Sequence, residues 1–191
     1  MVKLIVEAIP HVYLCCDALI TASDVASASR FQNDRRRREH LAWRRVVRNE
    51  LGRGVVIDYN EVGAPVVDTP NTHISVAHGG ERVAVAIADE PVGVDIESLD
   101  RNYVRVKSRF MSAAEETLSE MEEWPAVVWT AKEAIYKLYG KREVDLTEDI
   151  RITNLDAERM LLTAEVRNTK GIAVEAQIIE NSVAVAVATY K

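Results

Sequence analysis

Two acidic side chains lie two residues apart in the segment Gly93-Val94-Asp95-Ile96-Glu97. Because side chains alternate between the faces of a strand, Asp95 and Glu97 would point to one face while Val94 and Ile96 point into a core. Two carboxylates with a third ligand nearby suit a hard cation such as Mg2+, which completes its shell with water and substrate phosphates. The segment therefore indicates a candidate metal site. A strand that simply ends in solvated acids would show the same alternation.

A second segment, Trp129 to Lys137, places three functional side chains on one face of a predicted helix. Trp129, Glu133 and Lys137 lie at positions i, i+4 and i+8. Glu133 could supply a third oxygen ligand or accept a proton, and Lys137 could reach a phosphate. The alternative is an exposed Glu–Lys pair that stabilises the helix by about 0.3–0.5 kcal/mol and does nothing else.

Together, the two segments resemble the phosphopantetheinyl transferase superfamily, specifically its larger, monomeric, surfactin-type branch. The family pattern is a Gly-hydrophobic-Asp-hydrophobic-Glu strand, followed some tens of residues later by Trp-x-x-Lys-Glu-x-x-x-Lys on a helix. Both are present in full and in that order. The resemblance covers roughly Arg30 to Gly140. It includes Arg30-Phe31 with the arginine-rich helix after it, Ile74-Ser75-Val76-Ala77-His78, and Arg109-Phe110-Met111-Ser112.

The resemblance implies a site for coenzyme A and a divalent metal ion. Asp95, Glu97 and Glu133 would hold Mg2+, or Mn2+ in its place, against the diphosphate of coenzyme A. Glu133 is also the candidate to take the proton of the attacking serine, and the sequence leaves its two roles open. Lys137 and His78 would contact phosphate oxygens, Lys137 as a point charge and His78 as a hydrogen-bond donor. Glu133, Lys137 and His78 are thus the predicted catalytic residues.

Further contacts to coenzyme A are implied for other basic residues. The Lys132 side chain leaves the helix about 100° from that of Glu133, so it would touch the 3'-phosphate or only solvent. In the Arg35 to Arg38 run, four consecutive helix positions spread over the whole circumference, and about two can face one ligand. Arg37 and Arg38 are the two assigned to coenzyme A.

Two positions depart from the family pattern. Ala77 stands before His78 where relatives usually carry Ser, so one hydroxyl contact to coenzyme A would be missing. Gly63-Ala64-Pro65 stands where relatives commonly read Gly-Lys-Pro, which removes a cation near the 3'-phosphate. We therefore expect altered nucleotide affinity or selectivity.

By this resemblance, the chain would transfer the 4'-phosphopantetheine arm of coenzyme A onto a serine of an apo carrier protein of acyl, polyketide or peptidyl type. The leaving group would be adenosine 3',5'-bisphosphate. Two alternatives stay open: a non-catalytic member that binds coenzyme A or a carrier, and, outside the family, a Mg2+-dependent phosphodiesterase or nuclease.

Carrier domains tend to be acidic, so we expect them to dock on the segment from Arg101 to Met121. Its expected contact residues are Arg101, Arg105, Lys107, Arg109, Phe110 and Met111.

The composition limits these interpretations. The 191 residues are 48% hydrophobic, which suits one compact domain or two small fused halves. The formal net charge of −6 argues against nucleic-acid binding, despite an arginine cluster between Arg30 and Arg53.

No apolar run approaches the about 20 residues needed to cross a bilayer. Met1-Val2-Lys3 leads into a predicted strand rather than a signal peptide, and the adjacent Cys15 and Cys16 suit a reducing compartment. We expect a cytoplasmic monomer that binds neither membranes nor nucleic acid.

The elements that position these residues follow from caps, turns and periodicity. Helices are predicted over Thr21–Ala28, Asp34–Leu51, Tyr103–Lys107, Ser112–Met121 and Pro125–Tyr139. Strands are predicted over Val2–Ala8, Val55–Tyr59, Ile74–Ala77, Arg82–Ala88, Val92–Glu97, Asp149–Thr153, Leu161–Val166, Ile172–Ile179 and Ser182–Ala188. The repeated order of helix and strands indicates an α+β fold with two similar halves, 1–98 and 99–191. The resemblance adds that they form a pseudo-dimer, each half a helix on a small, mostly antiparallel sheet, with the active site in the cleft between them.

Overall fold

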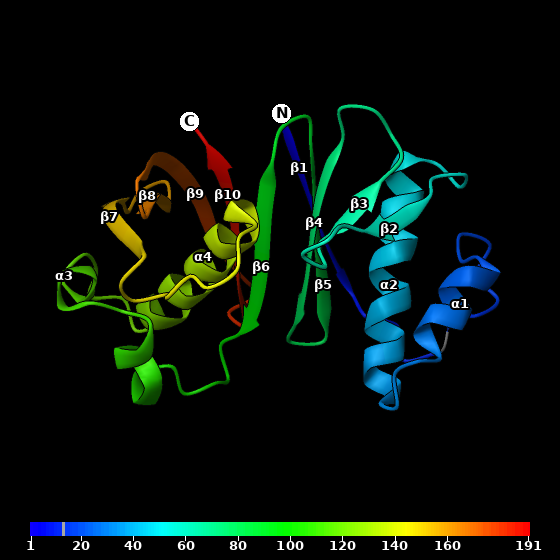
Figure 1. The fold of residues 1–191 in the computed structure, drawn as a ribbon. Coiled ribbons are helices and arrows are strands. Elements are labelled where there is room, and N and C mark those ends of the chain that lie inside the picture. Colours follow the sequence, from blue (N-terminus) through cyan, green and yellow to red (C-terminus); the bar gives the residue numbers. More distant parts are fainter. Residues whose placement is uncertain (13) are drawn as a thin grey trace.

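Two antiparallel sheets lie face to face in the protein, and a long helix covers the outer face of each (Figure 1). The computed structural model describes residues 1–12 and 14–191. The fold is α+β, as the order of helices and strands predicted. Within the described residues, no helix is both long and apolar enough to span a membrane.

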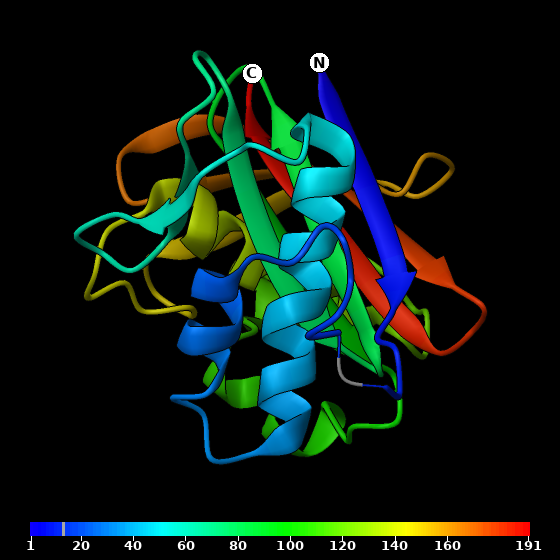
Figure 2. The ribbon, with the colours of Figure 1, turned by 90° about the vertical axis from the view of Figure 1, so that its right-hand side faces the viewer.

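The first sheet has three strands in the order β1-β5-β4. Its strands are β1 (Val2–Ala8), β4 (His73–Gly79) and β5 (Arg82–Ala88), each antiparallel to its neighbour. Helix α2 (Asp34–Leu51) lies across the outer face of this sheet, and α1 (Ala22–Ala28) packs on α2 (Figure 2). A separate hairpin of β2 (Ile57–Tyr59) and β3 (Pro65–Val67) connects α2 to β4. The sequence predicted β2 within Val55–Tyr59 but did not predict β3.

The second sheet has five strands in the order β6-β10-β9-β8-β7, all antiparallel. Its strands are β6 (Val92–Ser98), β7 (Ile150–Asp156), β8 (Leu161–Val166), β9 (Thr169–Ile179) and β10 (Val183–Tyr190). Helix α4 (Trp124–Tyr139) packs on its outer face. The 3-10 helix η1 (Val104–Arg109) and the short α3 (Ala113–Glu116) lie between β6 and α4 in the chain.

Strand β6 joins parts of the chain that the sequence assigned to different halves. Residues 92–98 fall in the predicted half 1–98, yet β6 is the edge strand of the second sheet, with Val94 opposite Val187 of β10. It also lies beside β4, where the Val94 N–H donates to Ser75 Oγ at 3.0 Å. The absence of a side chain at Gly79 permits this approach, because a Cβ there would lie 2.3 Å from the Ile96 carbonyl oxygen. The two sheets therefore do not divide at residue 98.

Alternation along the strands assigns side chains to separate core layers. In β5, Val83 and Val85 pack with Trp43 of α2, whereas Ala84 and Ala86 face the second sheet. The small alanines let the two sheets pack closely, while the valines fill the wider space beneath the helix. This pattern is the two-residue period expected of a strand buried on both faces.

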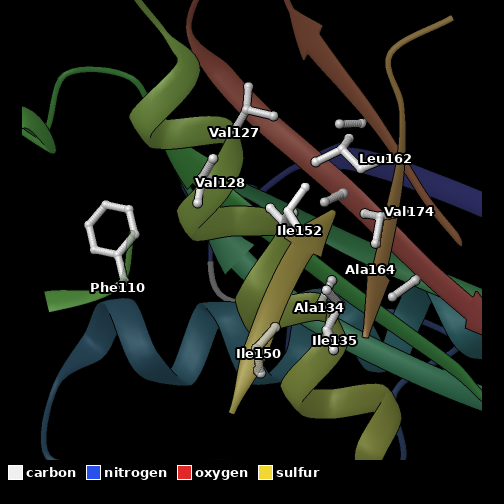
Figure 3. Close-up of a cluster of buried hydrophobic side chains, with 14 of the residues drawn as sticks. Phe110, Val127, Val128, Ala134, Ile135, Ile150, Ile152, Leu162, Ala164 and Val174 are labelled. Atoms are coloured by element: carbon white, nitrogen blue, oxygen red, sulfur yellow. The ribbon is translucent and has the colours of Figure 1, made fainter. Parts of the chain in front are cut away.

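The largest hydrophobic cluster lies between α4 and the second sheet (Figure 3). Its members include Ala134, Ile135, Ile150, Leu162 and Val174. Phe110 and Met111 also belong to it, and the Phe110 ring meets Trp129 edge-on with 5.1 Å between ring centroids. The prediction that Phe110 and Met111 contact a carrier protein is therefore wrong, since both are buried.

Both long helices end close to where the sequence predicted. The Asn33 side chain accepts the Arg35 N–H at 2.8 Å and so caps the start of α2. Gly52, with φ of +106°, ends that helix. Pro125 occupies the first turn of α4, and Gly140 terminates it in the left-handed region at φ +63°.

The predicted helix over Ser112–Met121 is reduced to the single turn of α3. The Ser112 capping box is present. However, the Glu115 carbonyl accepts the Trp124 Nε1–H at 2.8 Å and the Leu118 N–H at 3.2 Å. These bonds replace the i to i+4 hydrogen bond that a longer helix would need at this carbonyl.

Candidate active site

Gly93 brings the two chemical segments together. A Cβ at this position would lie 2.0 Å from the Ala134 carbonyl oxygen and 2.7 Å from the Leu138 nitrogen, so only glycine lets α4 rest directly on β6. Asp95 and Glu97 follow on the same face of β6 and meet side chains of α4. The alternation predicted from the sequence is thus present.

Asp95 is 7% exposed and is held from one side only. Its Oδ1 accepts a hydrogen bond from Lys137 Nζ at 2.8 Å. Its Oδ2 is buried and has no hydrogen-bond partner among the described residues. Burial raises the pKa of Asp95, while the positive charge of Lys137 acts in the opposite direction. An unpartnered, buried carboxylate oxygen at this position fits a cation.

Glu97 is oriented by three donors. Its Oε1 accepts from Trp129 Nε1 at 2.8 Å, and its Oε2 accepts from Arg101 at 2.6 Å and from the Tyr103 hydroxyl at 3.2 Å. Burial and the neighbouring Glu97 charge raise the pKa of Tyr103, so its hydroxyl remains a neutral donor. Trp129 of α4 therefore helps to fix the orientation of Glu97 on β6.

Glu133 is the third carboxylate of this group and is half-buried. Its side chain forms no hydrogen bond or ion pair with residues 1–12 or 14–191. Burial, and then the negative charge of Asp95, raise the pKa of Glu133. In that same part of the chain, no three His, Cys, Asp or Glu side chains lie close enough together to form a complete metal site. Asp95, Glu97 and Glu133 are therefore neighbours rather than a closed cage.

Lys137 connects α4 to both sheets. Besides Asp95, its Nζ donates to the Val94 carbonyl at 2.9 Å and to the Val76 carbonyl at 3.4 Å. These three acceptors match the three donors of an ammonium group. A phosphate contact at Lys137 would therefore replace one of these bonds.

A pocket of about 830 Å³ opens beside this group. Its walls come from α2, β4, the β2–β3 hairpin and the end of α4. Its cationic residues are Arg36, Lys137, Lys141 and Arg142. Its aromatic residues are Phe31, His40, Trp43, Tyr59, His78 and Tyr136. The pocket thus combines positive charge with flat apolar surfaces, which suits a phosphorylated heteroaromatic ligand.

His78 lies in the pocket wall, with its two ring nitrogens in different environments. Its Nε2 is 2.9 Å from Arg36 NH1, and its Nδ1 is 3.4 Å from Glu39 Oε2. Because a guanidinium can only donate, Nε2 is the acceptor in this contact. In the free protein Nε2 of His78 therefore accepts from Arg36, and donation by His78 to a phosphate oxygen stays a prediction.

A family model described as the 4'-phosphopantetheinyl transferase superfamily matches residues 91–188, which contain β6, α4, β7, β8, β9 and most of β10. The chain belongs to this superfamily. A 4'-phosphopantetheinyl transferase of Bacillus pumilus, psf-1, is 35% identical over 94 residues, which is 46% of this chain and 40% of that protein. The gsp transferase of Aneurinibacillus migulanus is 30% identical over 50% of this chain and 42% of its own length. Sfp of Bacillus subtilis is 26% identical over 50% of this chain and 49% of its own length. The matches therefore span less than half of each relative.

Lys132 belongs to the superfamily segment but does not face the pocket. Its side chain is fully buried, and its Nζ donates to Glu115 Oε2 at 2.9 Å and to the Leu146 and Ile150 carbonyls at 2.8 Å each. The prediction that Lys132 touches coenzyme A or solvent is wrong, because α3 and β7 cover this side of α4. Glu115 also accepts the Ile152 N–H at 2.8 Å, so the pair ties α3, α4 and β7 together.

Arg37 and Arg38 do not line the pocket either. Arg37 Nε donates to the Phe31 carbonyl at 2.7 Å, and Arg38 NH1 donates to the Pro10 carbonyl at 3.3 Å. Successive residues are turned by about 100°, and Arg36 is the arginine on the pocket face of α2. Arg36 begins an i, i+3, i+4, i+7 series that continues through Glu39, His40 and Trp43, all of which line the pocket. That periodicity was the signal available in the sequence.

Lys141 and Arg142 were also missed, because they follow the glycine that ends α4. Arg142 NH2 donates to the Glu61 carbonyl at 3.4 Å and so links the end of α4 to the β2–β3 hairpin. Ala64, at which the family resemblance implied the loss of a lysine, lines the pocket as well. Residue 64 brings no positive charge to the pocket, but Lys141 and Arg142, which follow α4, bring two.

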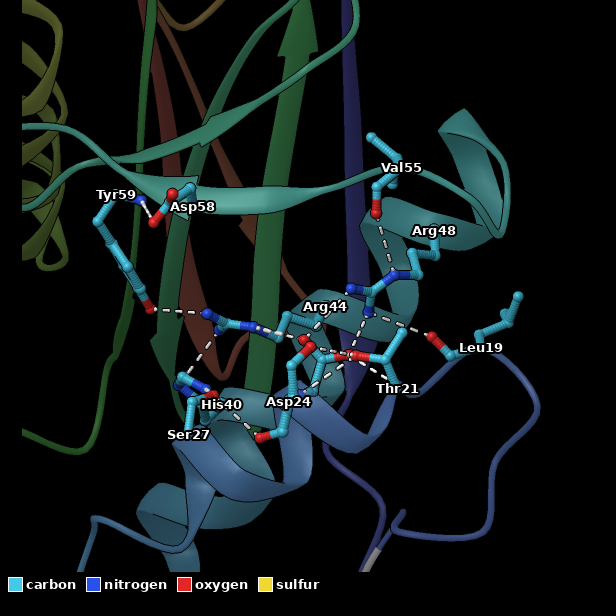
Figure 4. Close-up of polar contacts among 11 residues, drawn as sticks. Leu19, Thr21, Asp24, Ser27, His40, Arg44, Arg48, Val55, Asp58 and Tyr59 are labelled. Atoms are coloured by element: carbon cyan, nitrogen blue, oxygen red, sulfur yellow. Dashed lines mark hydrogen bonds and ion pairs between the residues drawn. The ribbon is translucent and has the colours of Figure 1, made fainter.

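A buried polar network supports the aromatic wall (Figure 4). Arg44 Nε lies 3.1 Å from Asp24 Oδ1, and the same guanidinium donates to the Tyr59 hydroxyl and to His40 Nδ1, each at 3.2 Å. Arg48 pairs with the same Asp24 carboxylate. Burial, assisted by the charge of Arg44, lowers the pKa of His40 to about 4, so the ring is neutral and can accept. The network fixes His40 and Tyr59, two of the side chains that form this wall.

Proposed function

We propose that this chain transfers the 4'-phosphopantetheine arm of coenzyme A to a serine of an apo carrier protein, releasing adenosine 3',5'-bisphosphate. One observation carries the proposal. Asp95 and Lys137, from the two defining segments of the superfamily, meet at 2.8 Å beside a pocket with four cations and an aromatic wall. The relatives named 4'-phosphopantetheinyl transferase support the same activity.

Coenzyme A would place its phosphates among Arg36, Lys137, Lys141 and Arg142. Positive side chains hold phosphate oxygens through charge-assisted hydrogen bonds. The aromatic wall offers the adenine ring a flat surface on which to stack. Lys141 and Arg142 would supply the positive charge that Ala64 lacks.

Asp95, Glu97 and Glu133 would hold Mg2+, and Mn2+ suits the same oxygen donors. The unpartnered Asp95 Oδ2 and the free Glu133 carboxylate fit this role, and one or two carboxylates suffice when substrate phosphates complete the shell. When bound, the ion would neutralise charge on the diphosphate. Trp129, which donates to Glu97, would orient Glu97 as a ligand.

The protein groups would then position the carrier serine and receive its proton. Glu133 is the proposed base, because burial and Asp95 raise the pKa of its carboxylate and so increase its proton affinity. Lys137 would stabilise negative charge on the transferred phosphate. Binding as a metal ligand would compete with the role of Glu133 as a base, and the two are separable by the metal dependence of a Glu133→Gln variant.

The carrier would dock on the basic, exposed side of η1. Arg101, Arg105 and Arg109 are exposed there, and Lys107 is half-buried. These charges complement an acidic partner.

We also propose that the fold is a pseudo-dimer of two halves with the active site in the cleft between them. We propose a cytoplasmic monomer without membrane or nucleic-acid partners, and the net charge of −6 disfavours nucleic acid.

Intact-mass spectrometry tests the activity directly. Apo carrier proteins of the acyl, polyketide and peptidyl types are incubated with the protein, coenzyme A and Mg2+, beside an Asp95→Ala control. A mass gain of one phosphopantetheine arm, absent with EDTA and in the control, supports the proposal. No gain on any carrier, despite measurable coenzyme A binding, would instead support the non-catalytic alternative.

A further inference from the structure

Glu39 is a buried carboxylate in the pocket wall that the proposed reaction does not use. It lies on α2, is 4% exposed and faces His78 of β4. Arg35 Nε donates to its Oε1 at 2.9 Å. Its Oε2 has only two distant nitrogen neighbours. These are His78 Nδ1 at 3.4 Å and Arg36 NH1 at 3.9 Å. No standard hydrogen bond reaches this oxygen within the described residues.

The two neighbours of His78 fix its protonation state. Arg36 can only donate, so Nε2 must offer its lone pair and the ring proton of neutral His78 must lie on Nδ1. The Nδ1–H then lies on the side of Glu39 Oε2, which is 3.4 Å from Nδ1 without a standard hydrogen bond and can only accept when ionised. Glu39, His78 and Arg36 therefore form a chain of carboxylate, imidazole and guanidinium along the pocket.

The charges around His78 oppose one another. Burial lowers the pKa of His78, Glu39 acts to raise it, and Arg36, Lys137 and Arg35 act to lower it. Arg35 and Arg36 come from α2, and Lys137 comes from α4. Removal of Arg36 from Nε2 by an incoming anion would take away one of the three positive charges that lower the pKa of His78, while Glu39 stays in place.

We propose that Glu39 is a positioning residue for His78, which keeps the proton on Nδ1 and stabilises the imidazolium that forms when a phosphate oxygen replaces Arg36 at Nε2. The inference rests on the proposed function for the identity of the phosphate ligand. In this step, Nε2 gains one proton from the solvent and keeps it, and the resulting Nε2–H donates a hydrogen bond to the phosphate oxygen. Arg36 keeps its protons and moves to the phosphate, and the Nδ1–H remains directed to Glu39. Ligand binding thus takes up one proton at His78.

The free protein tests the first part without any ligand. Ring nitrogen chemical shifts and pH titration of His78 are followed by NMR in the wild type, in Glu39→Gln and in Glu81→Gln. Glu81 is the matched control, because it lies 3.4 Å from the same Arg35 guanidinium but is exposed. We expect the Nδ1–H tautomer in the wild type. We also expect a titration midpoint at lower pH in Glu39→Gln, with no change in Glu81→Gln. An Nε2–H tautomer in the wild type, which needs no variant, or an unchanged midpoint in Glu39→Gln, overturns the inference.

Proton uptake tests the second part. Binding of adenosine 3',5'-bisphosphate is measured calorimetrically near neutral pH in buffers of different ionisation enthalpy. The dependence of the heat on the buffer gives the number of protons taken up. We expect uptake approaching one proton in the wild type and in Glu81→Gln, and less than half of it in Glu39→Gln. Equal uptake in Glu39→Gln and the wild type overturns the inference. Absence of bisphosphate binding in every variant would count against the proposed function, while the NMR titration would still decide the role of Glu39.

Discussion

Gly93 of β6 lies so close to Ala134 of α4 that a methyl group on Gly93 would sit 2.0 Å from the Ala134 carbonyl oxygen. The neighbour is helix backbone, which cannot rotate away as a side chain could. Asp95 and Glu97 continue the same strand, and Lys137 continues the same helix, so this contact sets the distance between the acids and the lysine. Gly93 of the superfamily strand pattern therefore has a packing role, which is independent of the chemistry of the acids and the lysine.

Gly93→Ala should consequently separate α4 from β6. We expect the free energy of unfolding in urea to fall by about 3 kcal/mol, at the upper end of the typical cost of overpacking. Gly54→Ala is the matched control, because nothing lies within 4 Å of a Cβ at Gly54. Equal stability of the two variants would show that α4 moves at no cost and that the close contact is not a constraint.

Lys132 and Glu115 form a buried ion pair, and removal of one partner should leave an unpaired charge in the core. We expect Lys132→Met to lower the free energy of unfolding by about 3–5 kcal/mol, and Glu115→Gln combined with Lys132→Met to recover part of it. Lys107→Met serves as control, since its pair with Glu116 is solvent-exposed and such pairs contribute about 0–1 kcal/mol. If Lys132→Met weakened coenzyme A binding while its stability remained intact, the structural role would be refuted.

His40 should make the protein less stable in acid. Its pKa is about 4 in the folded protein, below the about 6.5 of an unfolded chain, so the unfolded state binds more protons between these values. Stability therefore falls as the pH drops through about 6.5 and levels off below about 4, with a total loss of about 3 kcal/mol. His40→Gln should flatten this part of the curve in chemical denaturation, whereas substitution of the exposed His73 should not. An unchanged slope in His40→Gln would contradict the assignment.

Local signals in the sequence determined most of the secondary structure. The bounds of α2 follow from Asn33 and Gly52, and those of α4 follow from Pro125 and Gly140, because caps and breakers act within one turn. Alternation likewise placed Asp95 and its partner acid on one face of β6. These are short-range effects, which a single sequence carries in full.

Long-range packing produced the errors. Asp89-Glu90-Pro91 indicates a turn after β5, but no local feature shows that β6 then pairs with β10, more than 80 residues later. Lys132 was assigned to the ligand because the sequence does not show that α3 and β7 bury it. Arg37 and Arg38 were chosen over Arg36 for the same reason, since the pocket face of α2 depends on where β4 packs.

Trp129 should control the metal requirement of the proposed transfer. Its Nε1 donates to Glu97 at 2.8 Å, and Trp129→Phe removes this donor while it retains an aromatic ring against Phe110. A residue that orients a metal ligand typically changes metal affinity by about 10–100-fold, so the Mg2+ concentration for half-maximal transfer should rise by this factor. The rate at saturating Mg2+ should change much less. Tyr136→Phe, which alters another aromatic residue of α4, should leave the Mg2+ dependence unchanged. A lower saturating rate with the same Mg2+ dependence would place Trp129 in the chemistry or the packing rather than in metal orientation.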